Sequence, residues 1–438
     1  MLAVHVLREA GPGTKVTLIG QGPFGRGVAY GTHNPDHLLN VRVANMSAFA
    51  DDPSHFLRWL WMQDVPAYAD IPPSGHAFVS RKTYGDYVVA VFEELCAGAG
   101  PAVTTVDAAA VQLHPGLRPS VTLADGRRLY FDRIALCVGN FPAGPPPGLS
   151  AAAQDSAHYV NDPWQWTMAG LAPEDDILIL GSGLTMADTV QSLLGKGHQG
   201  QIRVISRRGL VPLRHEPART YELKPPTGSL VEMLAAVREN VRVAVLGGYD
   251  WRHVFDALRP YTAALWQGLS VEDQARFLRH LRPYWDVHRH RLAPAVADAI
   301  ADLRARGCLR IDAGRAVAID RDGDGFIVDL ALRDGSTSRI KPRWIINCTG
   351  AARDFRAIGD PLMQGALDRG VIRPDPLGLG IDVTAGNVVI GADGEVSENI
   401  VAIGPPTRGR FWEVIAVPDI RGACARVAKT LAAPLPAR

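Results

Sequence analysis

The chain has 438 residues, 47% of them hydrophobic and 21% charged, which is the composition of a globular protein with a large core. At about 100–200 residues per domain, this length predicts two or three domains. The formal net charge is only +1, so we expect neither nucleic acid nor an anionic membrane surface as a partner. The five cysteines are scattered and include no C-x-x-C pair, which argues against a disulfide framework or a zinc site and favours a cytoplasmic protein. No apolar run approaches the ~20 residues of a membrane span.

The first third of the chain mixes helix and strand patterns with clear turn signals. Two apolar runs flank an Asp-Gly turn, which is typical of a hairpin, and the run PAGPPP then predicts a stiff linker and a domain boundary. In chain order we expect a helix over 1–11, a strand over 15–19, a glycine-rich loop over 20–27, helices over 53–62 (with Asp52 as N-cap) and 84–96, the hairpin and a buried strand within 120–139, and the linker at 142–147.

The remainder begins with a strand, a glycine turn, a helix and a second strand, which together predict a βαβ unit. Residues 327–350 echo residues 120–139, because both have strand, Asp-Gly turn, strand, buried strand and glycine in that order. We expect the two strands of the βαβ unit at 177–180 and 202–205, helices over 228–305, strands over 310–349, two short strands around Asp393-Gly394 within 387–403, and a last helix over 418–431.

The turn after the strand ILIL has the chemistry of a nucleotide-binding loop. Gly181 permits a tight turn, Gly183 lets the backbone approach a pyrophosphate, and the helix that follows offers free N–H groups to phosphate oxygens. Met186 replaces the third glycine of the usual fingerprint. The residues that we predict at this site are Gly181, Ser182, Gly183, Leu184, Thr185 and Asp188.

The second strand of this unit ends in Ser206, Arg207 and Arg208 rather than in an acidic residue. An Asp or Glu at this place binds the ribose hydroxyls of NAD, whereas guanidinium groups suit the 2′-phosphate of NADPH. We therefore predict NADPH over NADH. The alternative is that the two arginines form only a solvated turn.

Three longer stretches carry a resemblance to a known family. GRGVAYGTHNPDHLLNVRVANMSAFADDPSHFLRWL (25–60), GSGLTMAD with SRRGLVPLRH (181–215) and IGPPTRGRFWEVIAVPDIR (403–421) resemble a bacterial family of FAD/NAD(P)-binding proteins. The order and spacing of these stretches extend the resemblance over nearly the whole chain. The family is similar to the wider class of flavoproteins with two dinucleotide-binding domains, which includes flavin-dependent monooxygenases and disulfide reductases.

The resemblance implies that FAD lies across the first domain and NADPH on the second. It also implies a strand and a GxGxxG-type turn ahead of Met1, and an acidic residue after strand 15–19, where Gly20 and Gln21 stand. The residues that it assigns to the cofactors, beyond those of the 181–208 unit, are Gly25, Arg26, Gly27, Asn40, Val41, Met46, Ser47, Gly139, Gly350 and Gly404.

We therefore expect an α/β fold with two Rossmann-like, doubly wound domains that carry β-meanders. The FAD domain comprises residues 1–150 and 351–438, and the NADPH domain, 151–350, is inserted in it. The predicted function is an FAD-dependent, NADPH-using oxidoreductase that passes electrons to O2 and acts on a small molecule, as a monooxygenase does. The alternatives are a flavin reductase that serves a quinone or a protein, and a non-catalytic nucleotide-binding or redox-sensing protein.

Other residues with reactive side chains point to no catalytic group, and the oligomeric state stays open. His288 and His290 are two positions apart and do not share a helix face, so we expect no metal site. Cys348 ends a buried strand, where cysteine behaves as a small hydrophobe. Trp412 and Glu413 either line a cofactor or substrate, or begin an ordinary helix.

Overall fold

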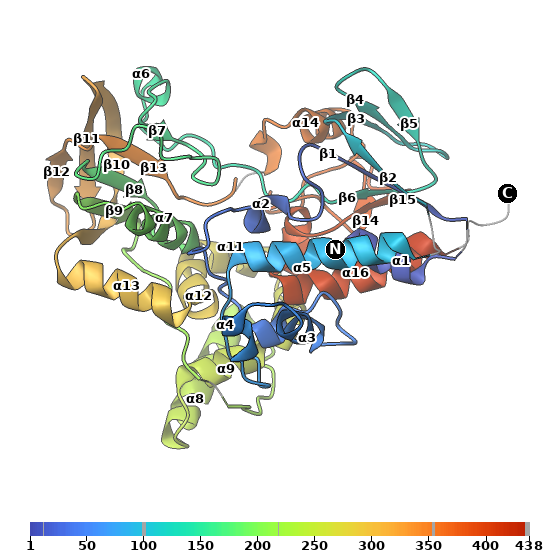
Figure 1. Cartoon of the computed structure of the whole chain (residues 1–438), viewed down its shortest axis with the longest axis horizontal. Helices are drawn as coiled ribbons and strands as arrows, with labels where there is room; N and C mark the ends of the chain where they lie inside the picture. Colours follow the sequence, from blue (N-terminus) through green and yellow to red (C-terminus); the bar gives the residue numbers. More distant parts are fainter. Residues whose placement is uncertain (12, 99–101, 218, 353–354, 434–438) are drawn as a thin grey trace.

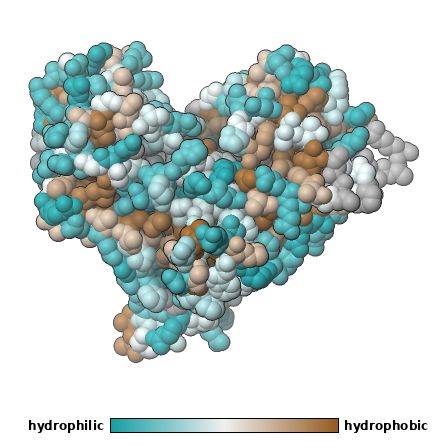
Figure 2. Space-filling model, viewed as in Figure 1, coloured by the Kyte–Doolittle hydropathy of each residue, from teal (hydrophilic) through white to brown (hydrophobic). Residues whose placement is uncertain are grey.

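The computed structural model describes residues 1–11, 13–98, 102–217, 219–352 and 355–433. Two lobes, each built around β-sheets, stand side by side above a layer of helices (Figure 1). The space-filling view shows a notch between the lobes (Figure 2). The protein has an α/β fold, as the sequence predicts.

One lobe contains a seven-stranded sheet of order β12-β11-β10-β9-β8-β13-β7. Its strands are β7 (Tyr159–Val160), β8 (Ile177–Leu180), β9 (Ile202–Ser206), β10 (Leu309–Asp322), β11 (Gly325–Leu332), β12 (Thr337–Ile340) and β13 (Trp344–Asn347). The strands β7, β13, β8, β9 and the first part of β10 run parallel, whereas β10, β11 and β12 form an antiparallel meander.

The apolar run of β8 explains its central place in this sheet. All four of its residues are buried, because both faces of the strand are covered. Ile177 and Ile179 pack beneath α7 (Leu184–Gly195) and α13 (Pro294–Ala305), while Leu178 and Leu180 pack against the meander. The sheet therefore has helices on one face and its own folded-over strands on the other.

The other lobe combines three small sheets with helices from both parts of the chain. A parallel pair joins β1 (Lys15–Gly20) and β2 (Ala102–Asp107); a second sheet has the order β14 (Val388–Ile390), β15 (Val396–Ala402), β6 (Ile134–Leu136); and the third is the meander β3 (Ala110–His114), β4 (Ser120–Leu123), β5 (Arg128–Tyr130). The larger helices of this lobe are α1 (Leu2–Glu9), α5 (Arg81–Ala97), α14 (Pro361–Asp368) and α16 (Val417–Ala432). α14 packs on β3, whereas α5 and α16 both pack on α1. Because β15 pairs with β6 and α16 packs on α1, segments from the two ends of the chain form one lobe.

The helical layer consists of consecutive elements, of which α8 and α9 lie at the bottom of Figure 1 and α11 and α12 lie near its centre. They are α8 (Leu230–Leu246), α9 (Trp251–Leu258), η2 (Arg259–Tyr261), α10 (Thr262–Gly268), α11 (Val271–His280) and α12 (Arg282–Arg289). α10 contacts the short helix α15 (Arg408–Phe411), where the Trp266 indole N–H donates to the Gly409 carbonyl oxygen at 2.8 Å. No helix in the described ranges combines the length and the apolar character that a membrane span requires.

Short helical turns complete the described part of the chain. They are α2 (Gly27–Tyr30), α3 (His55–Trp61), α4 (Pro66–Ala69), α6 (Ala151–Gln154), η1 (Val43–Asn45), η3 (Phe355–Ala357) and η4 (Pro405–Thr407). The predicted echo between 120–139 and 327–350 is confirmed as the equivalent series β4-β5-β6 and β11-β12-β13. The prediction of Asp52 as a helix N-cap is wrong: α3 begins after Ser54, and the Asp52 carboxylate instead forms an ion pair with Arg58.

Candidate functional site

The glycine turn between β8 and α7 is the tightest backbone feature of the seven-stranded sheet. Gly181 has φ +99°, and a Cβ atom there would lie 2.4 Å from the carbonyl oxygen of Cys348, which follows the neighbouring strand β13. Gly183 has an ordinary φ of −85°, and nothing lies within 4 Å of the Cβ that it lacks. Gly181 is thus required by packing within the protein, whereas Gly183 leaves open space at the start of α7.

That open space is where a phosphate group would find donors. Gly183 is the N-cap of α7 and provides no side-chain cap, so the first N–H groups of the helix, at Leu184 and Thr185, point toward it. Met186, which stands in place of the third fingerprint glycine, is fully buried in the core beneath the helix. The turn therefore has the form of a phosphate-binding loop. The Met186 side chain packs the first turn of α7 onto the sheet.

A chain of polar atoms ties this turn to the end of β9. The Ser182 hydroxyl lies 2.7 Å from Ser206 Oγ and 2.5 Å from the Leu210 carbonyl oxygen. The Gly209 N–H in turn donates to Ser206 Oγ at 3.1 Å. The two serines that the sequence predicts at the site are therefore in contact, and they fix the spacing between the glycine turn and the arginines that follow.

A pocket of about 290 Å³ lies beside these serines and is lined by Arg207, Arg208 and Arg333. Arg208 is held in place by Tyr284, whose hydroxyl oxygen is 3.2 Å from Nη1 and whose ring lies 5.1 Å from the guanidinium carbon. Arg333 follows β11, and its backbone N–H bonds to Ala313, the register partner of Ser206. The sequence analysis missed Arg333, because this residue is more than a hundred positions after Arg208 and reaches the pocket only where β11 folds back onto β10. The one local signal is that Arg333 directly precedes an Asp-Gly turn.

Asp188, which the sequence predicts at the nucleotide site, makes a contact between the two lobes. Its carboxylate forms a buried ion pair with Arg81 of α5, at 3.1 Å. Burial raises the pKa of Asp188, and the nearby guanidinium opposes this rise. One turn later on α7, Ser192 Oγ lies 2.6 Å from His37 Nε2. The helix behind the glycine turn is thus joined to the other lobe by side chains on its second and third turns.

The glycine-rich segment 25–30 lies along α5. Gly25 and Gly27 both have positive φ angles, of +99° and +61°, and a Cβ on Gly25 would lie 3.0 Å from the Val89 side chain. Arg26 between them forms an ion pair with Asp86, at 2.5 Å. These glycines allow the chain to turn sharply over α5 on its way into the centre of the molecule.

The predicted residues of segment 40–47 differ in how accessible they are. The Asn40 carbonyl oxygen accepts a hydrogen bond from His215 Nε2 at 3.0 Å, and Val41 is half-buried. Met46 is only 1% exposed within the core, and the Ser47 hydroxyl donates to the Asp52 carbonyl oxygen at 2.6 Å. The side chains of Met46 and Ser47 are therefore used by the fold itself, which leaves Asn40 and Val41 at the junction of the lobes.

Three glycines end core strands at the carboxyl edges of the sheets. Gly139 follows β6, Gly404 follows the parallel neighbour β15, and Gly350 follows β13. Their φ angles are +71°, +81° and +90°, and nothing lies within 4 Å of a Cβ built on any of them. Dinucleotides bind outside the carboxyl ends of parallel strands, so this space, which side chains would fill, fits FAD in one lobe and NADPH in the other.

The loop after Gly404 leads into a buried polar cluster with α12. Glu413 forms an ion pair with Arg289 at 2.8 Å and accepts a hydrogen bond from the Trp285 indole N–H at 2.7 Å. Trp412 has φ 58° and ψ −70°, and the Glu413 N–H bonds back to the Phe411 carbonyl oxygen at 2.7 Å, which is a strained γ-turn. Trp412 and Glu413 thus do not begin a helix; a strained turn aims Glu413 at α12.

The histidines of α12 serve packing and electrostatics within this cluster. The His288 ring stacks on Phe255 with centroids 5.2 Å apart. Burial, together with Arg289, lowers the pKa of His290 to about 3. Among the residues described, no three His, Cys, Asp or Glu side chains are grouped as metal ligands.

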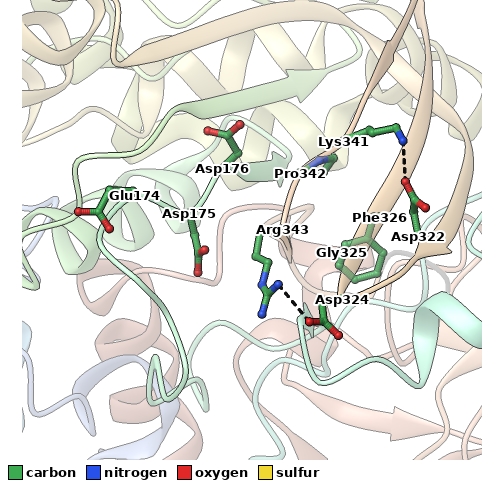
Figure 3. Close-up of a pocket in the computed structure, with 10 residues that line it drawn as sticks. All are labelled: Glu174, Asp175, Asp176, Asp322, Asp324, Gly325, Phe326, Lys341, Pro342 and Arg343. Carbon is green, nitrogen blue, oxygen red and sulfur yellow. Dashed lines mark hydrogen bonds and ion pairs between the residues drawn. The ribbon is translucent and has the colours of Figure 1, made fainter.

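A second pocket, of about 390 Å³, lies at the opposite edge of the seven-stranded sheet (Figure 3). Asp176 precedes β8 and Arg343 precedes β13, so the pocket lies at the amino ends of these strands. Two of its walls are closed by the ion pairs Lys341–Asp322 (2.8 Å) and Arg343–Asp324 (3.5 Å), which Figure 3 marks. Because ligands of such sheets bind at the carboxyl ends, we do not assign the cofactors to this acidic pocket.

Comparison with known proteins agrees with this geometry. Residues 1–141 match the model of a family described as FAD-NAD(P)-binding. No curated protein sequence matches the chain. Among solved structures, ornithine N-hydroxylase from Kutzneria sp. 744 aligns with a TM-score of 0.62 at 13% identity, covering 98% of this chain and 95% of its own.

Two further solved structures extend the range of relatives by fold. L-lysine 6-monooxygenase from Pseudomonas syringae aligns with a TM-score of 0.59 at 15% identity, over 95% of this chain and 99% of its own. Thioredoxin reductase from T. acidophilum aligns with a TM-score of 0.51 at 10% identity, over 98% and 93%. At these identities the likeness establishes the shared two-domain fold, which monooxygenases and disulfide reductases both have.

Proposed function

We propose, for a chain whose residues 1–141 match the FAD-NAD(P)-binding family, the function of an FAD-dependent oxidoreductase that uses NADPH. The observation that carries this proposal is the pairing of a phosphate-binding turn at Gly181 with a pocket of three arginines beside Ser206. The seven-stranded sheet, within 151–350, would hold NADPH. The lobe made from 1–150 and 351–438 would hold FAD.

The arginine pocket supports NADPH over NADH. In this arrangement the pyrophosphate would lie at Gly183 and the first N–H groups of α7, and the 2′-phosphate would lie among Arg207, Arg208 and Arg333. Guanidinium groups bind phosphate in a bidentate manner, and Tyr284 already fixes one of them in position. NADH lacks the 2′-phosphate and would leave the pocket without its anion.

FAD would lie along Gly25–Gly27 and Asn40–Val41 and across the carboxyl ends of β6 and β15, where Gly139 and Gly404 leave space. The chemistry that FAD supplies when bound is two-electron transfer between a nicotinamide and a second acceptor. The chain's own contribution is to orient the two cofactors from separate lobes and to exclude water between them. The contact of α7 with α5 through Arg81 and Asp188 would set their relative position.

The state of the cysteines favours oxygen over a disulfide as the final acceptor. All five cysteines are free, and burial raises the pKa of Cys348, the one nearest the glycine turn, to about 12. A thiol held protonated in this way is a poor nucleophile, so thiol–disulfide exchange there is disfavoured. We therefore propose a monooxygenase-like reaction on a small molecule, and free cysteines fit a reducing, cytoplasmic setting. A reductase that serves a quinone or a partner protein is the second candidate, and a non-catalytic nucleotide sensor is the third.

The test is the visible spectrum of the purified chain incubated with FAD, followed by anaerobic addition of NADPH or NADH. We expect a flavin band close to one per chain that is bleached faster by NADPH. Arg333→Ala should remove most of the preference for NADPH, while Arg321→Ala, on the same sheet but outside the pocket, should keep it. A chain that takes up no FAD would disprove the proposal. Oxygen uptake without quinone reduction would favour the monooxygenase, and rapid quinone reduction would favour the second candidate.

A further inference from the structure

Three arginines surround His215 where the helical layer meets the two lobes. Arg289 is the last residue of α12, Arg291 follows it two residues later, and Arg42 comes from the segment predicted to lie along FAD; we call these three the arginine cluster. Arg291 is 1% exposed and Arg289 is 8% exposed. His215 is anchored between them, because its Nε2 bonds to the Asn40 carbonyl oxygen at 3.0 Å.

The carboxylates of the cluster do not balance its positive charge. Arg291 is paired with Asp256, and Arg289 is paired with Glu413. Arg42 donates to a backbone oxygen, that of Glu216, and forms no ion pair within the described part of the chain. Three guanidinium groups thus face two carboxylates, which leaves one positive charge in excess.

Several donors of the cluster also have no acceptor. Arg289 Nη2 and both Nε and Nη1 of Arg291 are buried and lack a hydrogen-bond partner among the described residues. Buried donors of charged groups almost always have a hydrogen-bond acceptor in folded proteins. Several buried guanidinium N–H groups without one therefore indicate a site for a ligand that accepts hydrogen bonds. An oxyanion would satisfy the donors and the excess charge together.

His215, which lies among the three arginines, is neutral. Burial lowers its pKa to about 3, and the positive charges of Arg291, Arg42 and Arg289 add to the effect. With Nε2 donating to Asn40, the neutral ring leaves Nδ1 as a bare acceptor, and Nδ1 is buried without a partner among the described residues. The neutral His215 ring therefore contributes no charge to the arginine cluster, and its Nδ1 stands as a buried acceptor beside it.

Aromatic rings lie beside one guanidinium group of the cluster and continue toward Glu413. The Arg291 guanidinium carbon lies 5.8 Å from the centroid of the Trp251 ring. Trp251 packs on Phe255, and Phe255 packs on Trp285, which itself donates to Glu413. Such walls suit an apolar or aromatic body attached to the anion.

We propose that the arginine cluster binds the carboxylate of a small organic substrate with an apolar body. Its place between Asn40 and the loop after Gly404 would put that substrate beside the site proposed for FAD. The substrate role therefore rests on the proposed function, whereas the binding itself does not. Because the donors are buried, entry of the substrate requires a local opening of the structure around them.

Benzoate is the probe, because it joins a carboxylate to an aromatic ring, and uncharged benzamide is its matched control. The full chain is titrated at constant ionic strength while tryptophan fluorescence and the unfolding temperature are followed. We expect saturable binding of benzoate that raises the unfolding temperature, and no such effect from benzamide or from an equal concentration of chloride. Equal responses to benzoate and chloride, or none, would overturn the proposal.

Variants of the cluster locate the binding. Arg291→Met should weaken benzoate binding at least tenfold, Arg291→Lys should weaken it less, and Arg276→Met, on the exposed side of α11, should leave it unchanged. If Arg291→Met does not fold, Arg42→Met serves in its place, because it breaks neither buried ion pair. Wild-type affinity in a folded Arg42→Met and Arg291→Met would refute the assignment.

The alternative source of an oxyanion is the phosphate of a nucleotide. A benzoate titration repeated with saturating NADP+ should give the same affinity if the cluster binds a separate carboxylate. Competition by NADP+ would instead assign the cluster to the cofactor and overturn the proposal. Neither titration requires flavin reduction. A failure to bind benzoate can therefore be distinguished from a failure of the proposed oxidoreductase function.

Discussion

Gly181 and Gly183 are two residues apart, yet the structure predicts different outcomes when each becomes alanine. At Gly181 the added Cβ would meet the Cys348 carbonyl oxygen at 2.4 Å, in a backbone conformation with φ +99°. Clash and strain of this kind each cost about 1–3 kcal/mol, so we expect Gly181→Ala to lower the free energy of unfolding by about 2–4 kcal/mol. Urea unfolding of the variant and the wild type measures this difference.

Gly183→Ala is the matched control. Its φ is ordinary and the space around it is open, so we expect a change in the free energy of unfolding of less than about 1 kcal/mol. The methyl group would instead occupy the space assigned to a phosphate, and NADP+ binding measured by calorimetry should weaken at least tenfold. Unchanged affinity in a stable Gly183→Ala would contradict the placement of the nucleotide.

His215 gives a prediction about pH. Its pKa is about 3 in the folded chain, mainly through burial, against about 6.5 when unfolded. Between these values the unfolded state binds a proton that the folded state does not, so stability is full above pH 6.5 and falls as the pH decreases toward 3. One such group contributes a slope of up to about 1.4 kcal/mol per pH unit.

We therefore expect the free energy of unfolding to be lower at pH 5 than at pH 7, with a smaller difference in His215→Gln. Glutamine can still donate to the Asn40 carbonyl oxygen but does not titrate. His76→Gln, at an exposed position, is the control and should keep the wild-type slope. An identical pH dependence in His215→Gln and the wild type would show that His215 is accessible to protons in the folded chain.

At the scale of elements, the contact of α5 with α7 joins the two lobes through a buried ion pair. Arg81→Met would leave the carboxylate of Asp188, which is 8% exposed, without its partner. Removing one member of a buried pair costs about 3–5 kcal/mol, whereas replacing both with apolar residues costs far less. Thermal unfolding should thus show Arg81→Met strongly destabilised and Arg81→Met/Asp188→Leu largely recovered, with exposed Lys82→Met as the control. A double variant no more stable than Arg81→Met would indicate that the ion pair itself, rather than unpaired charge, governs the contact.

A helix or strand of this chain can be predicted from the sequence where the residues that determine it are close together in the sequence. The four apolar residues of β8, the glycine turn and the strand before Ser206 lie next to one another in the sequence, and the structure contains all of them. The Asp-Gly turns likewise predict the two series of strands that end at Gly139 and Gly350. These patterns depend on side-chain period and backbone conformation within a few residues, which a sequence displays directly.

The contacts between distant segments are not predictable in this way. Arg333 reaches the end of β9 only because β11 folds back onto β10, and Arg81 meets Asp188 only because the two lobes pack together. Closeness in sequence predicts Asp188 near the nucleotide turn, but it does not predict its ion-pair partner, which comes from α5. The burial of Arg289 and Arg291 is likewise not predictable from the sequence, because Trp251 and Phe255, which pack beside this segment, belong to the separate helix α9.

At the scale of the whole molecule, the two proposed cofactor sites lie in different lobes, so we expect a substitution in one lobe to impair one cofactor only. Gly404 ends β15 in one lobe, and Arg333 follows β11 in the other. Gly404→Ala places a methyl group in the space assigned to FAD at a strain of about 1 kcal/mol, because its φ is +81°. We expect lower flavin content after purification and an unchanged dissociation constant for NADP+.

Arg333→Ala is the reciprocal change and should give the reciprocal result. It removes one of three guanidinium groups from the pocket proposed for the 2′-phosphate, and charge-assisted contacts of this kind contribute about 1.5–3 kcal/mol. Calorimetry should therefore show NADP+ binding weakened by about tenfold or more, while flavin content stays at the wild-type level. If either variant impaired both cofactors equally, the sites would not be divided between the lobes. Electron transfer would then have to be explained by a single shared cleft rather than by two cofactors oriented from separate sheets and held together through α5 and α7.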